Sequence, residues 1–243
     1  MHRFFVPREW IGEDRVELRG ESAHQISHVL KLKPPEHIIL LDNRGWEYEV
    51  QLEGLSGELV QGRVVGKSRG TGEPGVKITL CQALLKSDKF ELVLQKGVEL
   101  GVSAFVPFIS QRCVVRKPNE NRLSRWRKII QEAAEQSGRV LLPQIHPVVS
   151  FEEACQLASS PALLLWEEEK SLGLANLLRQ PSFQKAPAYH LFVGPEGGFP
   201  AHEVEYARAR GIISASLGRR VLRAETAGLA AISALLFARG ELG

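Results

Sequence analysis

The sequence of 243 residues has few cysteines and no apolar run long enough to cross a bilayer. Its three cysteines, Cys81, Cys113 and Cys155, are scattered singly, which argues against a disulfide framework or a zinc ribbon. The longest apolar region, residues 224–238, is interrupted by polar side chains and is shorter than the roughly 20 residues that a membrane span needs. Charged residues from Arg3 to Arg15 break any apolar core of a signal peptide. We therefore expect a cytoplasmic protein with cysteines that serve packing.

Several motifs of common enzyme classes are also missing. The chain has no Gly-x-Ser-x-Gly elbow and no Walker lysine motif, so hydrolase and P-loop functions lack support. Residues 70–75 satisfy the Gly-x-Gly-x-x-Gly pattern, but a strand follows where a dinucleotide site requires a helix. His24 and His28 have the spacing of one helix face without a third ligand nearby. We therefore predict no metal site and expect structural or RNA-contacting roles for these histidines.

The net charge of +3 is small, but basic residues gather in one segment. Two interpretations stay open for this segment: a phosphate-contacting surface, or a solvated helix face. The spacing of Trp126 with Leu123, Ile130 and Ala133 matches one apolar helix face, which favours core packing over base stacking. The basic residues, interrupted by the single acid Glu120, are Arg112, Arg116, Lys117, Arg122, Arg125, Arg127 and Lys128.

The pattern of apolar residues divides the chain into two predicted domains, residues 1–70 and 71–243. Short alternating runs at 37–41, 46–52 and 58–65 indicate strands and suggest a small β-barrel. Residues 66–75 are rich in glycine and charge and predict a linker.

Beyond the linker, strand and helix patterns alternate, which predicts an α/β domain with a mostly parallel sheet. The last helix, at about 225–239, is apolar nearly all round and implies a buried partner. Strands are predicted at 76–84, 104–109, 162–166, 189–193 and 214–217, and helices at 90–98, 123–137, 151–158, 172–178 and 201–210.

Two glycine-marked loops near the C-terminus are the most informative feature of the chain. Gly194-Pro195-Glu196-Gly197-Gly198 and the loop 217–227 each follow a short apolar run that predicts a buried strand. Both loops would leave the same edge of a sheet, where α/β proteins gather their ligand sites. Glycine lets the backbone approach a ligand closely, so the loops predict a pocket in which backbone amides and carbonyls bind the ligand.

Together these loops resemble the cofactor loops of the SPOUT class of methyltransferases, and within that class the chain resembles the RsmE family. The resemblance covers most of residues 84–236 and is looser near the N-terminus, where Lys31 replaces an arginine and Pro34-Pro35 replaces a Gly-Asp turn. Besides the two loops, it rests on Gln95-Lys96-Gly97-Val98-Glu99-Leu100-Gly101-Val102, Arg112, the segment 126–139 and Pro143.

The resemblance implies a trefoil-knotted domain that uses S-adenosylmethionine, preceded by a PUA-like RNA-binding β-barrel. It further implies a homodimer that methylates N3 of a uridine in 16S ribosomal RNA, within the assembled small ribosomal subunit. The cofactor residues that it implies are Leu165, Val193, Gly194, Glu196, Gly197, Gly198, Ser216, Leu217, Gly218, Val221, Leu222, Thr226 and Ala227. The RNA-binding residues that it implies are Arg3, Arg8, Lys31, Arg112, Arg139 and Arg220.

Uracil N3 carries a proton and is a poor nucleophile until that proton leaves, so a base or stabilising cations should assist methyl transfer. Arg223 in the cofactor loop is the choice for holding the base or its phosphate. Glu225 suits either the role of proton acceptor or that of a partner for the N-terminal dipole of the last helix. Glu196 could bond adenosine or tie its loop to a neighbouring helix.

Two other functions remain open at the level of sequence. The chain could be another SPOUT enzyme, which methylates a ribose 2′-oxygen or a tRNA base. It could also be a non-catalytic RNA-binding assembly factor in which the 194–198 loop binds an anion. The methylated nucleoside distinguishes the enzymes from each other, and binding of S-adenosylmethionine distinguishes them from the assembly factor.

Overall fold

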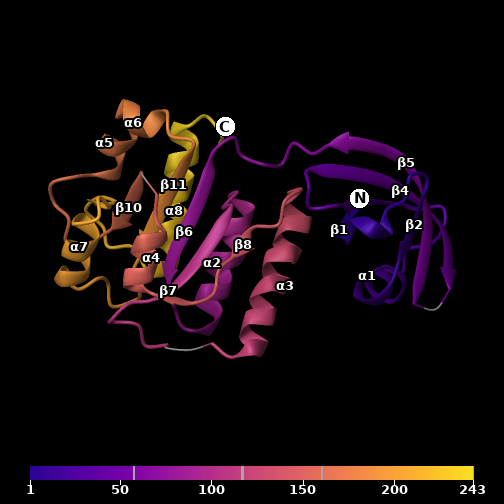
Figure 1. The fold of residues 1–243 in the computed structure, drawn as a ribbon, viewed down its shortest axis with the longest axis horizontal. Coiled ribbons are helices and arrows are strands. Elements are labelled where there is room, and N and C mark those ends of the chain that lie inside the picture. Colours follow the sequence, from indigo (N-terminus) through magenta and orange to yellow (C-terminus); the bar gives the residue numbers. More distant parts are fainter. Residues whose placement is uncertain (57, 116–117, 160, 243) are drawn as a thin grey trace. The chain divides into compact units, whose positions relative to one another are not determined.

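The chain divides into two units, each built around one β-sheet (Figure 1). The computed structural model describes residues 1–56, 58–115, 118–159 and 161–242. The first unit comprises Met1–Glu73 with Ala134–Leu142, and the second comprises Pro74–Ala133 with Pro143–Gly243. A short segment from within the predicted second domain is thus grouped with the first unit.

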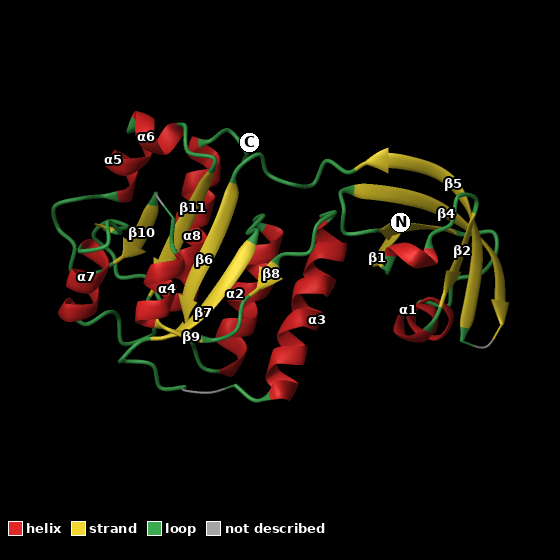
Figure 2. Ribbon diagram, viewed as in Figure 1, coloured by secondary structure: helices red, strands yellow, loops and turns green. Residues whose placement is uncertain are grey.

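The first unit has a five-stranded sheet in the order β1-β3-β4-β5-β2. Strands β1 and β3 are parallel, and the other neighbours pair antiparallel (Figure 2). The elements are β1 (His2–Phe5), a 3₁₀ turn (Arg8–Trp10), β2 (Arg15–Leu18), α1 (Gly20–His24), a π-helical turn (Gln25–Val29), β3 (His37–Leu41), β4 (Trp46–Ser56) and β5 (Leu59–Arg69).

The predicted strand at 37–41 is confirmed, but the hairpin that follows is longer than the sequence indicated. The sequence predicts a linker at residues 66–75, and this prediction is wrong for residues 66–69 because they continue β5. They stay in the ladder because residues 46–49 of β4 supply pairing partners as far as Trp46 and Arg69. Interstrand hydrogen bonds therefore override the weak strand propensity of Gly66 and Ser68.

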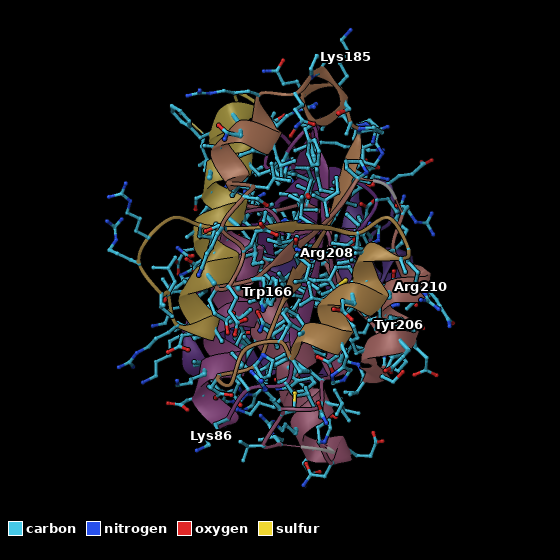
Figure 3. The ribbon with its side chains drawn as sticks, turned by 90° about the vertical axis from the view of Figure 1, so that its left-hand side faces the viewer. Lys86, Trp166, Lys185, Tyr206, Arg208 and Arg210 are labelled. Carbon is cyan, nitrogen blue, oxygen red and sulfur yellow. The ribbon has the colours of Figure 1, made fainter. Side chains whose placement is uncertain are left out.

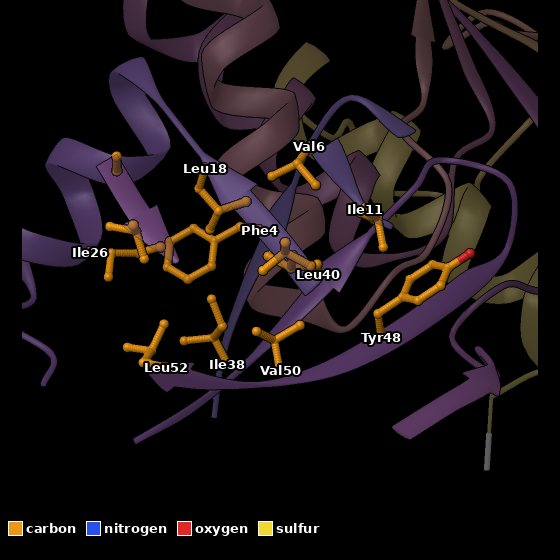
Figure 4. Close-up of a cluster of buried hydrophobic side chains, with 13 residues drawn as sticks. Phe4, Val6, Ile11, Leu18, Ile26, Ile38, Leu40, Tyr48, Val50 and Leu52 are labelled. Carbon is orange, nitrogen blue, oxygen red and sulfur yellow. The ribbon is translucent and has the colours of Figure 1, made fainter. Parts of the chain in front are cut away.

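The core of the first unit lies on one face of this sheet (Figure 4). Along β4, Tyr48, Val50 and Leu52 are buried, while the residues between them are more exposed, as the two-residue period of a strand requires. Leu18 from β2 and Ile26 from the π-helical turn are fully buried against the same face. Burial of each large apolar side chain contributes about 1.5–3 kcal/mol, so this cluster is the main source of the unit's stability.

An ion pair ties the segment Ala134–Leu142 to the rest of the first unit. Arg139 is 3% exposed, and its Nη2 donates to Oε2 of Glu73 at 2.7 Å. Oε1 of Glu73 also accepts from the backbone N–H groups of Val140 and Leu141, each at 3.0 Å. Burial raises the pKa of Glu73, but the hydrogen bond and charge of Arg139 and the two amides outweigh it, so the pKa is lowered.

The second unit contains a parallel sheet in the order β12-β10-β11-β6-β7-β8, with β9 also paired to β7. The predicted α/β class with a parallel sheet is therefore confirmed. The strands are β6 (Lys77–Ala83), β7 (Ala104–Ile109), β8 (Gln144–Ile145), β9 (Val149–Ser150), β10 (Ala162–Leu165), β11 (Ala188–Val193) and β12 (Ile213–Ala215). The helices are α2 (Ser87–Glu99), α3 (Glu120–Ser137), α4 (Phe151–Leu157), α5 (Leu174–Leu178), α6 (Pro181–Gln184), α7 (Ala201–Arg208) and α8 (Ala224–Ala238).

Helices cover both faces of this sheet. α8 contacts β6, β11 and α2, whereas α4 contacts β7, β9 and α7. In Figure 1, α4 lies in front of the strands and α8 lies behind them. All four residues of β10 are buried, which explains why the strand reads as a continuous apolar run.

The sequence correctly placed Trp126 and the cysteines in the core. Trp126 of α3 is fully buried, and its ring centroid lies 4.4 Å from that of Phe90 on α2. Cys81, Cys113 and Cys155 are all buried and free. Burial raises the pKa of the Cys155 thiol to about 12, so this thiol stays protonated and behaves as an apolar group.

Helix α8 is apolar on more than the face it buries. Gly228, Ile232 and Leu236 are buried against the unit, whereas Phe237 is 73% exposed. Ala230 and Ala234 continue the exposed side of the helix beyond its polar first turn, so the predicted, nearly all-round apolar character is present. Among the described residues, no helix combines the length and the apolar character that crossing a membrane demands.

We expect Gly62→Ala to destabilise the protein by about 1–3 kcal/mol, which is the usual cost of overpacking. A Cβ at position 62 would lie 2.6 Å from Cγ1 of Val50 and 2.8 Å from the carbonyl oxygen of Gln51, and neither atom can swing away. Gly66→Ala is the matched control in the same strand, since its Cβ would lie an ordinary 3.5 Å from Glu49. Urea unfolding of both variants checks this expectation, and equal midpoints would contradict it.

Candidate functional site

A pocket of about 410 Å³ opens at the carboxyl ends of β10, β11 and β12. Leu165, the last residue of β10, is in register with Val193 on one side and Ala215 on the other. The three following loops therefore leave the sheet at one level, as the sequence predicted for the two glycine loops. Its lining consists of residue 89 and residues 165–167, 193–196, 198–199, 216–225 and 227.

The loop after β11 forms one wall of the pocket. The N–H of Gly198 donates to the carbonyl of Pro195 at 2.9 Å, which closes a tight turn. Gly198 has φ +67, and a Cβ there would collide with the carboxylate of Glu167 across the pocket. Oε1 of Glu196 accepts from the backbone N–H of Lys86, the N-cap of α2, at 3.3 Å. This contact gives Glu196 the loop-tying role that the sequence left open, and Glu196 also lines the pocket.

The loop between β12 and α8 forms the opposite wall. Gly218 has φ +107, and its N–H donates to Oγ of Ser216 at 3.1 Å, so the turn depends on a glycine. The side chain of Val221 is 82% exposed and that of Arg223 is 80% exposed, which leaves both available at the rim. The predicted residues of this loop that line the pocket are Ser216, Leu217, Gly218, Arg220, Val221, Leu222, Arg223, Glu225 and Ala227.

A lysine that the sequence reasoning missed completes this wall. Nζ of Lys89, on α2, lies 3.2 Å from Oε1 and 3.3 Å from Oε2 of Glu225, in the first turn of α8. Nη1 of Arg223 lies 4.0 Å from the same carboxylate. The Glu225 side chain is only 12% exposed and lies between these two cations. Lys89 follows β6, which neighbours β11, so the sheet-edge argument applied to β6 could have found it.

A buried carboxylate fixes the third wall, which follows β10. Oε2 of Glu169 accepts from Nη2 of Arg208 at 2.7 Å and from the hydroxyl of Ser214, and Oε1 accepts from Ser171. The hydrogen bonds from Ser171 and Ser214 lower the pKa of Glu169 to about 2. The Arg208 guanidinium lies 5.5 Å from the ring centroid of Trp166, which lines the pocket (Figure 3). This network therefore holds the segment that carries Trp166, another residue that the sequence reasoning missed.

Some predicted site residues of the second unit lie beside the pocket rather than in its lining. Arg112 packs behind the 194–198 loop, where its Nη1 donates to the carbonyl of Gly197 at 2.9 Å. Arg112 thus supports the loop from outside the pocket, and Gly197 is the loop residue that it contacts. Thr226 is exposed at the start of α8, and its N–H donates to the carbonyl of Arg223 at 2.8 Å.

The remaining predicted RNA-binding residues belong to the first unit. Arg3 is ion-paired with Glu47, and Arg8 donates to the carbonyl of Ile11. Lys31 is exposed and has a positive φ of 54°. Arg139 is buried in its ion pair with Glu73, so its guanidinium is not available to a phosphate.

The predicted basic cluster at 112–128 contains cations that are already engaged within the protein. Nη2 of Arg122 donates to the carbonyl of Leu85 at 3.2 Å, and Nη2 of Arg125 lies 2.8 Å from Oε2 of Glu91. Arg116 and Lys117 lie outside the described residues. In the parts that the structure describes, no group of His, Cys, Asp or Glu is arranged to hold a metal ion.

Comparison with known proteins defines the class of this chain. A family of RNA methyltransferase domains matches residues 72–236, which is more than half of the chain and includes all segments of the pocket. The chain is 32% identical to ribosomal RNA small subunit methyltransferase E of Bacillus subtilis, over 98% of this chain and 96% of the relative. It is 34% identical to the protein of the same name from Synechocystis, over 97% and 78% of the two chains. It therefore belongs to the ribosomal RNA small subunit methyltransferase E family, the RsmE family that the loops indicated.

Solved structures agree with this assignment. A ribosomal RNA small subunit methyltransferase E from Neisseria gonorrhoeae, bound to S-adenosylmethionine, superposes with a TM-score of 0.88 at 34% identity, over 98% of this chain and 97% of that chain. A methyltransferase from Legionella pneumophila, also with bound S-adenosylmethionine, gives a TM-score of 0.88 at 30% identity, over 97% of each chain.

We expect Glu169→Gln to lower the free energy of unfolding by about 3 kcal/mol at pH 7, because the pKa of this carboxyl falls from 4.5 to about 2 on folding. A pKa that folding lowers contributes stability above about pH 4.5, and this stability is lost as the pH falls through about 2. Urea unfolding at pH 7 and at pH 2.5 should therefore show a difference from the native protein that shrinks at the lower pH. The exposed neighbour Glu168, changed to Gln, is the control, and equal effects of the two changes would contradict the role of the network.

Proposed function

We propose that this protein transfers the methyl group of S-adenosylmethionine to N3 of a uridine in 16S ribosomal RNA, within the assembled small ribosomal subunit. The observation that carries the proposal is that both glycine loops line one pocket at the carboxyl edge of the sheet. Family membership and the S-adenosylmethionine bound to relatives of the same fold support it.

The pocket lining suits this cofactor. S-adenosylmethionine supplies an electrophilic methyl group on a sulfonium, so the protein mainly has to align the reacting atoms about 3–3.5 Å apart. Backbone groups of 193–198 and 216–222 would hold it, because glycines at 194, 198 and 218 have no Cβ to keep a ligand away from the backbone of these loops. The carboxylates of Glu167, Glu196 and Glu225 supply negative charge that suits the sulfonium, whereas the basic side chains at 89, 219, 220 and 223 of the same lining supply positive charge that suits RNA.

Glu225 and Arg223 are the residues that we propose act on the uracil. The Glu225 carboxylate lines the pocket beside Lys89, and its position there suits it to accept the N3 proton. The exposed Arg223 guanidinium at the rim can hold the base or its phosphate and stabilise the charge that forms on the uracil oxygens. Glu225 also lies in the first turn of α8, so it retains the dipole role considered from the sequence.

The substrate RNA must expose a single base. N3 lies on the Watson–Crick edge, so the target uridine has to be unpaired or turned out of its stack. Arg220 at the pocket and Arg112 behind the loop are the proposed contacts in the second unit, and Arg3, Arg8 and Lys31 in the first. We do not propose Arg139 as an RNA contact, because it is buried and forms an ion pair with Glu73.

The finer architecture belongs to the same proposal. β11 lies between β6 and β10, an order compatible with the trefoil knot of the resembled class, and the five-stranded sheet is compatible with a PUA-like barrel. The domains would be residues 1–70 for RNA binding and 71–243 for catalysis. The exposed side of α8 around Phe237 suits a homodimer interface, and a substrate in ribosomal subunits agrees with the predicted cytoplasmic location.

Incubation with S-adenosylmethionine and small ribosomal subunits that lack the modification tests the reaction. We expect N3-methyluridine when the RNA is digested and its nucleosides are identified by mass spectrometry. A 2′-O-methylated nucleoside or transfer only to tRNA would replace the substrate and keep the cofactor. Absence of both methyl transfer and cofactor binding would favour a non-catalytic assembly factor.

Gly218→Ala should weaken binding of S-adenosylmethionine at least about tenfold, which corresponds to roughly 1.4 kcal/mol. The reason is its φ of +107, which a residue with a Cβ adopts only with strain, in a loop that lines the pocket. Gly211→Ala is the matched control, because Gly211 has φ +80 and open space around its Cβ position but lies outside the lining. Calorimetric titration checks this, and similar losses of affinity in both variants would contradict the assigned role of the loop.

A further inference from the structure

One end of the sheet in the first unit carries a cluster of cations and aromatic rings, of which only Arg8 has been given a role so far. We call Arg8, Trp46, Tyr48, Lys67 and Arg69 the cation–aromatic cluster. Nζ of Lys67 lies 4.5 Å from the ring centroid of Trp46 and 5.3 Å from that of Tyr48. The guanidinium of Arg69 lies 4.1 Å from the Trp46 centroid, and that of Arg8 lies 5.5 Å from the Tyr48 centroid.

A β-bulge brings these side chains to one face. Glu49 pairs with Gly66 and Val50 pairs with Val64, so Val65 is an extra residue in β5. Before the bulge, the side of β5 that faces the core carries Val60, Gly62 and Val64. Because one extra residue reverses the alternation, Lys67 and Arg69 then point to the same side as Tyr48 and Trp46.

The apolar core therefore ends at the bulge. Beyond it, the same face of β5 carries the charged side chains of Lys67 and Arg69. Tyr48 marks the transition, because it closes one end of the buried cluster beside Ile11 (Figure 4). Bulges recur where a protein re-aims side chains for a function, and here the re-aimed side chains are two cations.

A buried carboxylate fixes the aromatic side of the cluster. Asp42 is 5% exposed, and its Oδ1 accepts from the N–H groups of Arg44 at 2.8 Å and Trp46 at 3.3 Å. Its Oδ2 accepts from the hydroxyl of Tyr48 at 3.2 Å. These bonds orient the start of β4, so the partly exposed Trp46 ring forms a fixed platform, while Tyr48, which is 3% exposed, belongs to the core.

The three cations of the cluster have no carboxylate partner among the residues that the structure describes, whereas their neighbours in the first unit do. Arg3 pairs with Glu47, and Arg63 pairs with Glu53. The nearby Glu49 lies on the opposite side of the sheet, where its Oε1 is 2.7 Å from Nδ1 of His37. Asp42 beside the cluster is engaged by the Tyr48 hydroxyl and two backbone N–H groups rather than by these cations. Three like charges without an ion-pair partner repel one another, which is the arrangement expected where a polyanion supplies the missing charge.

We propose that the cation–aromatic cluster binds an unpaired stretch of the substrate RNA. One base stacks on the layer formed by Trp46 and Arg69, while Lys67 and Arg8 contact the adjoining phosphates. Flat rings combined with unpaired cations are the chemistry of single-stranded nucleic acid binding, since every base has a face to stack and every nucleotide has a charge. An acidic peptide would use the cations but gain nothing from the platform. This inference rests on the proposed action on RNA.

Binding of a labelled single-stranded uridine oligonucleotide tests the proposal, measured by fluorescence anisotropy with the full-length protein over a range of salt concentrations. The double variant Lys67→Gln/Arg69→Gln should lose at least about tenfold in affinity, and the slope of log K against log salt should fall by roughly 0.7 for each lost phosphate contact. Arg15→Gln/Arg63→Gln is the matched control, because Arg15 and Arg63 are exposed residues opposite each other on β2 and β5. This change removes the same total charge as the Lys67→Gln/Arg69→Gln change.

Trp46→Leu separates stacking from charge. It should weaken binding roughly fivefold or more while the salt slope stays unchanged, because a stacking contact is lost and no cation is removed. Should this variant fail to fold, Arg69→Lys gives the same distinction, since it keeps the charge and removes the flat guanidinium.

Several results would overturn the assignment. Equal losses in the two double variants would mean that only overall charge matters. Equal dependence on the cluster for a duplex RNA, or for poly-glutamate, would point to a ligand other than unpaired RNA. Cofactor titration and methyl transfer by the native protein are measured in parallel. If methyl transfer fails while the selective loss of RNA affinity is seen, the proposed reaction falls and the RNA site stands.

Discussion

The register of three parallel strands is the constraint on which the candidate site depends. Leu165 is paired with Val193 and with Ala215, so β10, β11 and β12 end side by side. Every wall of the pocket begins within a residue or two of these positions. A slip of one residue in this ladder would move a loop by about 3.3 Å and turn its first side chain to the other face. The continuous apolar character of the strands fixes this register, because helices cover both sides of the sheet.

Irregular loops need further fixing, and charged groups at their bases supply it. Glu169 joins the segment after β10 to Ser214 on β12, so two walls of the pocket share one buried carboxylate. Lys89 and Glu225 join α2 to α8 in the same way. At the rim, Val221 is exposed, and the Arg223 side chain is 80% exposed with only a long contact of 4.0 Å to Glu225. The pocket thus combines a fixed base, suited to a small cofactor, with an open rim, suited to a large substrate.

The sequence was informative where a local pattern decides the structure. Apolar runs followed by glycine loops located two walls of the pocket, and helical spacing placed Trp126 in the core. It failed where a distant partner decides. The end of β5 depends on pairing with Trp46, and Arg139 is buried because Glu73 meets it from far along the chain. Lys89 lies at the pocket because β6 is the neighbour of β11 in the sheet. The spacing of apolar residues along the sequence does not reveal this strand order.

The ligands proposed for the two units call for different surfaces. A cofactor of fixed shape is best held by backbone groups, because glycine loops give the same amide geometry at every binding event. RNA of variable shape is better held by cations and rings, since charge acts at a distance and stacking tolerates any base. In the first unit, a single extra residue at Val65 makes this second kind of surface from a core face. Moving that residue out of β5 would restore the alternation and turn Lys67 and Arg69 away from the aromatic rings, which makes the bulge itself the determinant of the cation–aromatic cluster.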